Sequence, residues 1–124
     1  MVSKQRNILN WVLAGLVALV FIGSATMKLT GGPDVLKMAE GFGLDKTTFT
    51  FIAIVELTCL ALFLIPRTGI LGTLLLAAYM GGVIATHLEH GESIIAGVII
   101  QALIWITAVL RFPELTSRIS NKIQ

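Results

Sequence analysis

A glutamate inside an apolar run is the first residue of this sequence that needs a chemical explanation. Glu56 is the only charged residue between Thr48 and Pro66. A carboxylate surrounded by hydrocarbon is stable only when it is protonated or paired with a cation. Lys28 follows the preceding apolar run and is the nearest candidate partner, although its side chain can equally extend to lipid headgroups. Glu56 is therefore either a proton-exchanging or ligand-binding acid, or half of an interhelical contact that holds a bundle together.

Other polar residues fall at comparable depths in the neighbouring apolar runs. Helical rise places Glu56, Tyr79 and Gln101 at one level, about 12 Å below the end of the bundle that lies opposite the chain termini. No matching polar set occurs in the other half, so the pattern predicts a cavity that is open at one face rather than a channel. For Tyr79 and Gln101, an interhelical hydrogen bond is the more usual role of such a side chain, and a ligand contact is the alternative. The residues expected to share the cavity are Ser24, Lys28, Glu56, Tyr79, Thr86, His87 and Gln101.

Metal and redox-cysteine chemistry find little support in the sequence. His87 and His90 form an HxxH pair beside Glu89 and Glu92, which is a weak metal motif at a helix end, and we expect a solvated loop there with no metal. The single cysteine, Cys59, excludes an intramolecular disulfide and a CxxC pair. No cofactor motif is evident in the sequence.

The composition points to lipid as the solvent of the fold. Hydrophobic residues make up 56% and charged residues 13% of the 124 residues, whereas soluble domains carry about 25% charged residues. Backbone groups in lipid must be bonded internally, so the long apolar runs should be helices. We predict an all-α, integral membrane four-transmembrane-helix bundle that forms one domain over residues 1–124, with helices at about 8–28, 48–66, 69–88 and 93–111.

The links between these helices also carry information. Residues Val35 to Ala39 are expected to form a short interfacial helix, and Asp45 or Thr47 to cap the next helix. The net charge of +2 is too small to favour nucleic acid. Basic residues divide six to three between the two faces, which favours cytoplasmic N- and C-termini. The two groups are Lys4, Arg6, Arg67, Arg111, Arg118 and Lys122 against Lys28, Lys37 and Lys46.

Two further features leave alternatives open. The charged start and first apolar run, ending in Gly23-Ser24-Ala25, could instead be a secretory signal peptide, although the run is long for one. Ala77, Gly81 and Ala85 form a ridge of small residues that is expected to pack against a helix of the same chain. A homodimer contact through this ridge is the alternative.

Several stretches of the chain resemble the DoxX-like family of small four-helix bacterial membrane proteins. They are Phe21-Ile-Gly-Ser-Ala-Thr-Met-Lys28, Val55-Glu56-Leu, Leu64-Ile-Pro-Arg-Thr-Gly69, Leu71 to Leu88 and Leu110-Arg-Phe-Pro-Glu-Leu115. The family pattern places a Lys, a Glu and a His where Lys28, Glu56 and His87 stand, while Ala25 replaces a usual Gly. The resemblance implies a multi-pass protein of the bacterial inner membrane, and some relatives belong to membrane oxidoreductases such as thiosulfate:quinone oxidoreductase.

The functional hypothesis is a membrane protein that binds a small quinone- or lipid-like molecule, or an accessory subunit of a membrane oxidoreductase. In it Glu56 exchanges a proton, Lys28 stabilises the charge of Glu56 and His87 bonds the polar head of the ligand. The partners would be the lipid bilayer and membrane oxidoreductase subunits or a second copy of the chain. A structural or assembly subunit and a small dimeric transporter are the alternatives. Enzymatic activity stays undecided at this stage.

Overall fold

The computed structural model describes residues 4–119, and these form helices with no strand among them. The four long helices begin and end within a few residues of their predicted bounds, and α2 contains the expected Val35–Ala39 segment. The short α6 was not predicted. The elements are α1 (Lys4–Thr30), α2 (Pro33–Gly41), α3 (Lys46–Leu64), the 3-10 turn η1 (Pro66–Thr68), α4 (Gly69–Glu89), α5 (Ile95–Arg111) and α6 (Pro113–Ile119).

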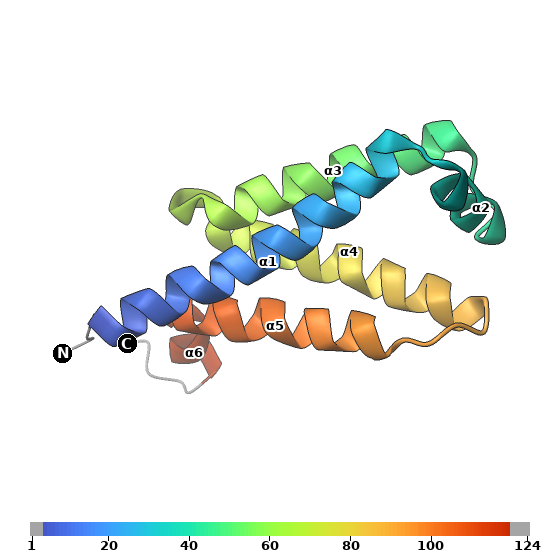
Figure 1. The fold of residues 1–124 in the computed structure, drawn as a ribbon. Helices are drawn as coiled ribbons and strands as arrows, with labels where there is room; N and C mark the ends of the chain where they lie inside the picture. The colour runs from blue at the N-terminus through green and yellow to red at the C-terminus, as the bar shows by residue number, and fades with distance from the viewer. Residues whose placement is uncertain (1–3, 120–124) are drawn as a thin grey trace.

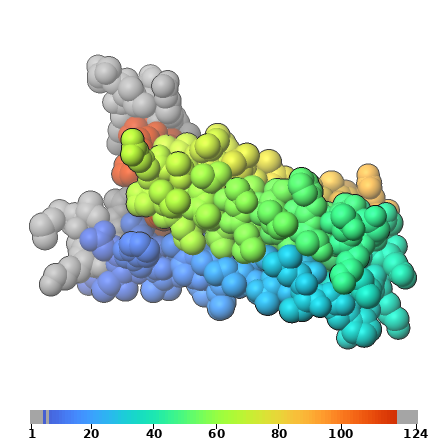
Figure 2. Space-filling model, turned by 90° about the horizontal axis from the view of Figure 1, so that it is seen from above, coloured from blue at the N-terminus to red at the C-terminus, as the bar shows by residue number. Residues whose placement is uncertain are grey.

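The long helices form a bundle in the cyclic order α1, α3, α4, α5. Short connections make neighbouring helices antiparallel, and α1 and α3 run side by side along one flank (Figures 1 and 2). The start of α1 and α6 lie at one end, which we call the terminal end (Figure 1). The opposite end, with α2 and the α4–α5 link, is called the pocket end (Figure 1).

The outer surface of the bundle is apolar. Trp11 and Leu19 on α1 and Ile95 on α5 are among the most exposed side chains. Three helices are long and apolar enough to cross a membrane, over Asn7–Thr30, Lys46–Leu64 and Pro66–Glu89. The fourth, α5, is a shorter apolar helix. Apolar side chains arranged on the outside of a helical bundle indicate a membrane protein, because lipid removes the cost of exposing them.

At the pocket end, local sequence signals fix where α2 and α3 begin. Pro33 opens α2 at a position where its missing N–H costs nothing. Asp45 caps α3 by accepting a hydrogen bond from the backbone N–H of Thr48 at 2.7 Å. Hydrogen bonds from the side chain and backbone of Thr48 lower the pKa of the Asp45 carboxyl. Of the two residues proposed as the cap, Asp45 is therefore the one used.

At the terminal end, α3 and α4 are in direct backbone contact. Gly72 lies against the backbone of Phe63, where an added Cβ would overlap the chain. Arg111 donates hydrogen bonds to the carbonyl oxygens of Phe63 at 2.8 Å and Leu64 at 3.1 Å. These bonds satisfy backbone acceptors that the last turn of α3 leaves open. The terminal end is thus closed by a glycine contact and an arginine cap.

The ridge of small residues does not pack as predicted. Gly81 and Ala85 are exposed, and no atom lies within 4 Å of a Cβ built at Gly81. The close contact between α4 and α5 involves Gly97 instead, where a Cβ would lie 2.8 Å from Cγ1 of Ile84. Small residues permit a close approach, but the side chains of the neighbouring helix decide where it happens.

Candidate functional site

Three helices meet in a polar network in the half of the bundle near the pocket end. The ammonium Nζ of Lys28 on α1 lies 2.9 Å from Oε2 of Glu56 on α3. The hydroxyl of Tyr79 on α4 donates to the same oxygen at 3.0 Å. The hydroxyl of Ser24, one helical turn before Lys28, donates to it at 3.4 Å. The chain therefore pairs Lys28 with Glu56, one of the two arrangements left open by the sequence.

All three ammonium donors of Lys28 have acceptors in this network. Lys28 donates to Ser24 Oγ at 2.7 Å, to Glu56 Oε2 at 2.9 Å and to the Tyr79 hydroxyl at 3.3 Å. The bond to Tyr79 is the longest of the three and the weakest by geometry. A molecule that offers an acceptor to Lys28 can replace this bond first, because Tyr79 keeps its own bond to Glu56.

Burial strengthens the attraction between Lys28 and Glu56 and makes either charge costly on its own. The side chain of Glu56 is 1% exposed and that of Lys28 is 13% exposed. Far from water, opposite charges attract strongly, while either charge alone carries a large desolvation cost. The ring of Phe49 lies 5.7 Å from the Lys28 ammonium, and the ring of Phe21 meets Tyr79 edge-on at 6.1 Å. These aromatic contacts hold the two donors in place.

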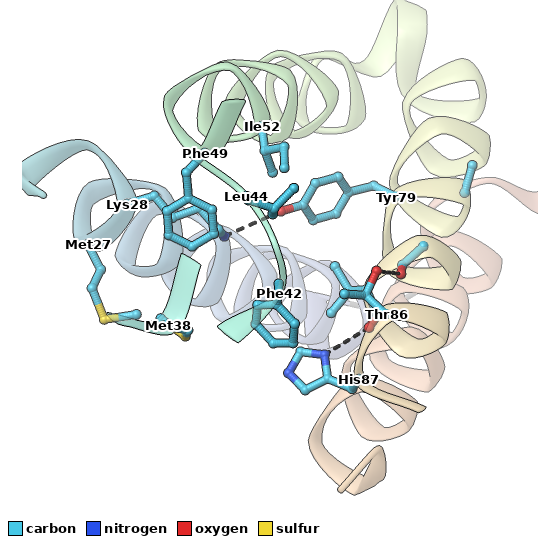
Figure 3. A pocket seen from close by; sticks show the side chains of 13 residues that line it. Met27, Lys28, Met38, Phe42, Leu44, Phe49, Ile52, Tyr79, Thr86 and His87 are labelled. Atoms are coloured by element: carbon cyan, nitrogen blue, oxygen red, sulfur yellow. Dashed lines mark hydrogen bonds between the residues drawn. The ribbon is translucent and has the colours of Figure 1, made fainter. Parts of the chain in front are cut away.

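A pocket of about 410 Å³ lies next to the network and is bounded by α1, α2, α3 and α4. Figure 3 shows the Tyr79 hydroxyl and the Lys28 ammonium meeting at its floor. Most of its wall is apolar. The lining residues are Met27, Lys28, Met38, Phe42, Leu44, Phe49, Ile52, Ala78, Tyr79, Gly82, Val83, Thr86 and His87.

Phe42 covers the pocket near the end of α4. Its ring centroid lies 5.1 Å from that of His87 and 5.2 Å from that of His90 (Figure 3 shows the first pair). Gly43, two residues after the end of α2, has a φ of 73°, a left-handed conformation that favours glycine. This turn carries the chain from Phe42 back into α3, so the same segment covers the pocket and begins the helix of Glu56.

The comparison with protein families agrees with this architecture. The model of the DoxX-like family matches residues 12–110, which include every residue that lines the pocket. The chain belongs to the DoxX-like family. It has no significant match among curated proteins or among solved structures.

The pocket of this DoxX-like protein includes only part of the predicted set. Lys28, Tyr79, Thr86 and His87 line it, and most of the other lining residues are apolar. Glu56 lies behind Lys28 and Tyr79 and is not one of the lining residues. Of its three hydrogen-bond partners, Lys28 and Tyr79 line the pocket, so direct proton exchange between Glu56 and a ligand does not fit this geometry.

Gln101 differs most from its expected place. Its Nε2 donates to the backbone carbonyl of Ala77 at 3.0 Å, and it does not line the pocket. Gln101 therefore joins α5 to α4 by an interhelical hydrogen bond, which is the more usual role of such a residue. The depth of a residue along its helix does not say in which direction its side chain points, and Gln101 points toward Ala77.

His87 lies at the rim with one ring nitrogen engaged. Its Nδ1 lies 2.8 Å from the carbonyl oxygen of Val83, which can only accept a hydrogen bond. Nδ1 therefore carries a proton, and Nε2 of the neutral ring is an acceptor. Thr86 likewise bonds within its own helix, to the Gly82 carbonyl at 2.8 Å. The rim can thus offer an acceptor nitrogen, while the floor offers donors.

Sequence reasoning did not identify the apolar lining residues from α1 and α2. Met27, Met38 and Phe42 contact the cavity, but apolar residues at helix ends carry no chemical signal of their own. The one available hint was the pattern of Val35 and Ala39, which are the buried positions of α2 and pack near Phe49.

Within residues 4–119, no group of three or more His, Cys, Asp and Glu side chains is placed to hold a metal ion.

Proposed function

We propose that this DoxX-like membrane protein binds a small amphiphilic molecule, quinone- or lipid-like, in the pocket between α1, α2, α3 and α4. The single observation that carries the proposal is an apolar pocket with Lys28 and Tyr79 at its floor. Ligand sites are typically concave, mostly apolar and equipped with a few convergent polar groups. The volume of about 410 Å³ lies within the usual range for such sites.

The proposal includes four membrane spans in a bacterial inner membrane, with both termini in the cytoplasm. The 17 residues of α5 extend about 25 Å, close to the thickness of the hydrocarbon core. The described Arg67 and Arg111 lie at the terminal end, while Lys37 and Lys46 lie at the pocket end. Lys122, part of the charge count that supports this orientation, lies outside the described residues. In this orientation the pocket belongs to the outer half of the bilayer.

Ligand recognition would use the hydrogen-bond donors at the floor of the pocket and the acceptor nitrogen of His87 at its rim. A carbonyl-type acceptor on the ligand would take the Lys28 donor that now points to Tyr79 at 3.3 Å. The apolar body would lie against the methionine and aromatic side chains of the wall. Family membership suggests a biological role for such binding. The protein would act with a membrane oxidoreductase, for example by presenting a quinone to it.

Native mass spectrometry of the gently extracted protein tests this function, combined with identification of any co-purified small molecule. The key variant is Gly82→Leu, because Gly82 lines the pocket and has open space around its Cβ position. We expect the wild type to retain an amphiphile and Gly82→Leu to lose it, because the new side chain fills the cavity.

Gly81→Leu is the matched control. Gly81 is the adjacent residue of α4, its Cβ position is equally open, and it does not line the pocket. The control should keep the bound molecule. Loss in both variants, or in neither, contradicts binding in this pocket. An empty protein that instead retains a stoichiometric protein partner in all three forms supports the alternative of a structural or assembly subunit.

A further inference from the structure

We infer that Glu56 determines the charge class of the ligand: by neutralising Lys28 from behind the pocket, it makes the site selective for an uncharged polar head. The inference rests on the proposed function and assigns to Glu56 a role in specificity without contact. It follows from two observations, the charged floor of the pocket and the position of the counter-charge outside its lining.

The electrostatics of the floor depend on the pair and not on Lys28 alone. Seen from the pocket, the ammonium of Lys28 comes first and the Glu56 carboxylate lies 2.9 Å behind it. An anionic head would be attracted by the first charge and repelled by the second, and it would also lose its own hydration. A cationic head would meet the ammonium first. The pair has no net charge, so a neutral head meets neither charge repulsion nor the cost of removing a charge from water.

A neutral acceptor also fits the hydrogen bonds that the floor can release. A ketone or quinone oxygen can accept a hydrogen bond from Lys28 and needs no counterion. Lys28 can provide this bond by giving up its contact with the Tyr79 hydroxyl at 3.3 Å, while its bonds to Ser24 and Glu56 stay intact. The ion pair thus remains closed when the ligand is bound, which keeps both buried charges satisfied.

Dodecanoate and undecyl methyl ketone are a suitable pair of probes, since they share the same undecyl chain and carbonyl group. The ketone carries a methyl group where dodecanoate carries its second, charged carboxylate oxygen. Dodecylammonium is the cationic counterpart. Affinities are measured at alkaline pH, where the acid is ionised, and corrected for the partition of each probe into protein-free bilayers. For the wild type we expect the ketone to bind more tightly than either ion.

Glu56→Gln should reverse the preference between ketone and carboxylate. The amide can still accept a hydrogen bond from Lys28, but the ammonium then lacks a counter-charge. A charge about 6 Å from the ligand head, at an effective dielectric constant near 20, changes the affinity ratio by on the order of 100-fold. Gln101→Leu is the control, because it removes a buried amide on α5 outside the pocket, and it should leave the ratio unchanged.

The possible results separate the two proposals. An unchanged ratio in folded Glu56→Gln overturns the inference but leaves ligand binding in place. If Glu56→Gln does not fold, the wild type decides alone, and binding of dodecanoate at least as tight as the ketone overturns the inference. Binding of none of the probes, or binding that Gly82→Leu does not reduce, contradicts the proposed function and this inference together.

Discussion

The two ends of the same helix pair, α3 and α4, are held together by different means. At the terminal end Gly72 brings α4 against the backbone of Phe63, and Arg111 caps the last carbonyls of α3. Toward the pocket end the helices separate (Figure 1), and about halfway along them the Tyr79 hydroxyl donates a hydrogen bond to Glu56 at 3.0 Å. Close packing leaves no room for a ligand, whereas a polar contact between separated helices leaves a cavity beside it.

This difference suits the proposed function, in which one end of the bundle is rigid and the other end binds a molecule. A glycine contact fixes the distance between two helices and tolerates no added atom. A network of long side chains holds helices at a greater distance, and its hydrogen-bond donors can also bond to a ligand. The contact of α3 with α4 at the polar network therefore depends on charge and hydrogen bonding, whereas their contact at the terminal end depends on close backbone packing together with the Arg111 cap.

The largest effect is expected at the pocket end, from Lys28→Met. This change leaves Glu56 buried without its cation, and breaking a buried pair typically costs about 3–5 kcal/mol. Adding Glu56→Leu should recover most of the loss, because the pair is then replaced by apolar side chains. Unfolding of Lys28→Met, Glu56→Leu and the double variant in detergent micelles measures this, and strictly additive losses would show that the pair is not coupled.

A glycine comparison should give the next largest effect. Gly72→Ala places a Cβ into the backbone of Phe63 and should destabilise the bundle by about 3 kcal/mol, since overpacking against backbone is hard to relieve. Gly82→Ala adds the same group in open space and should be neutral or stabilising by up to about 1 kcal/mol. Thermal unfolding of both variants gives the difference. Equal effects would refute the contrast between the two ends.

Tyr79→Phe should have an intermediate effect. It removes a hydroxyl that donates to Glu56 at 3.0 Å and accepts from Lys28 at 3.3 Å. Hydrogen bonds to charged groups are worth about 1.5–3 kcal/mol, and the ring stays to fill its space. Thr73→Val at the terminal end is the reference, because Thr73 bonds only to Gly69 within its own helix. A smaller loss for Tyr79→Phe than for Thr73→Val would contradict the importance of the network.

The smallest effect concerns the cap of α3. Hydrogen bonds from Thr48 lower the pKa of Asp45 in the folded protein, so the ionised form stabilises the fold. This stabilisation is present above the pKa of the unfolded chain and is lost as pH falls through the lower folded pKa. The stability difference between wild type and Asp45→Asn should therefore shrink in acid. A difference that grows in acid would show the opposite linkage.

Much of the fold could be predicted because lipid imposes simple rules on a sequence. Apolar run lengths gave the four long helices to within a few residues, and the N-cap pattern gave Asp45 as a candidate. The short α6 was missed, since its seven residues carry no long apolar run. Ridge packing was wrong at Gly81 because single-chain patterns do not say which neighbour fits a groove.

The site was predictable in its polar members and not in its shape. Buried charge is so costly that Glu56 had to have an explanation, and Lys28 was the natural partner. The rotation of α5 that turns Gln101 toward Ala77 depends on packing along the whole helix, for example of Gly97 against Ile84. The cover provided by Phe42 depends on how α2 folds back, which no local pattern specifies.

Photolabelling tests the central claim most directly, namely that the pocket end holds an amphiphile. Undecyl methyl ketone with a diazirine at the end of its chain is irradiated with the protein in bilayers, and the labelled peptides are mapped by mass spectrometry. We expect labels on the segments that contain Met27, Met38 and Ile52, and their loss in Gly82→Leu but not in Gly81→Leu. Labels spread evenly over exposed residues such as Trp11, unchanged by Gly82→Leu, would contradict the account.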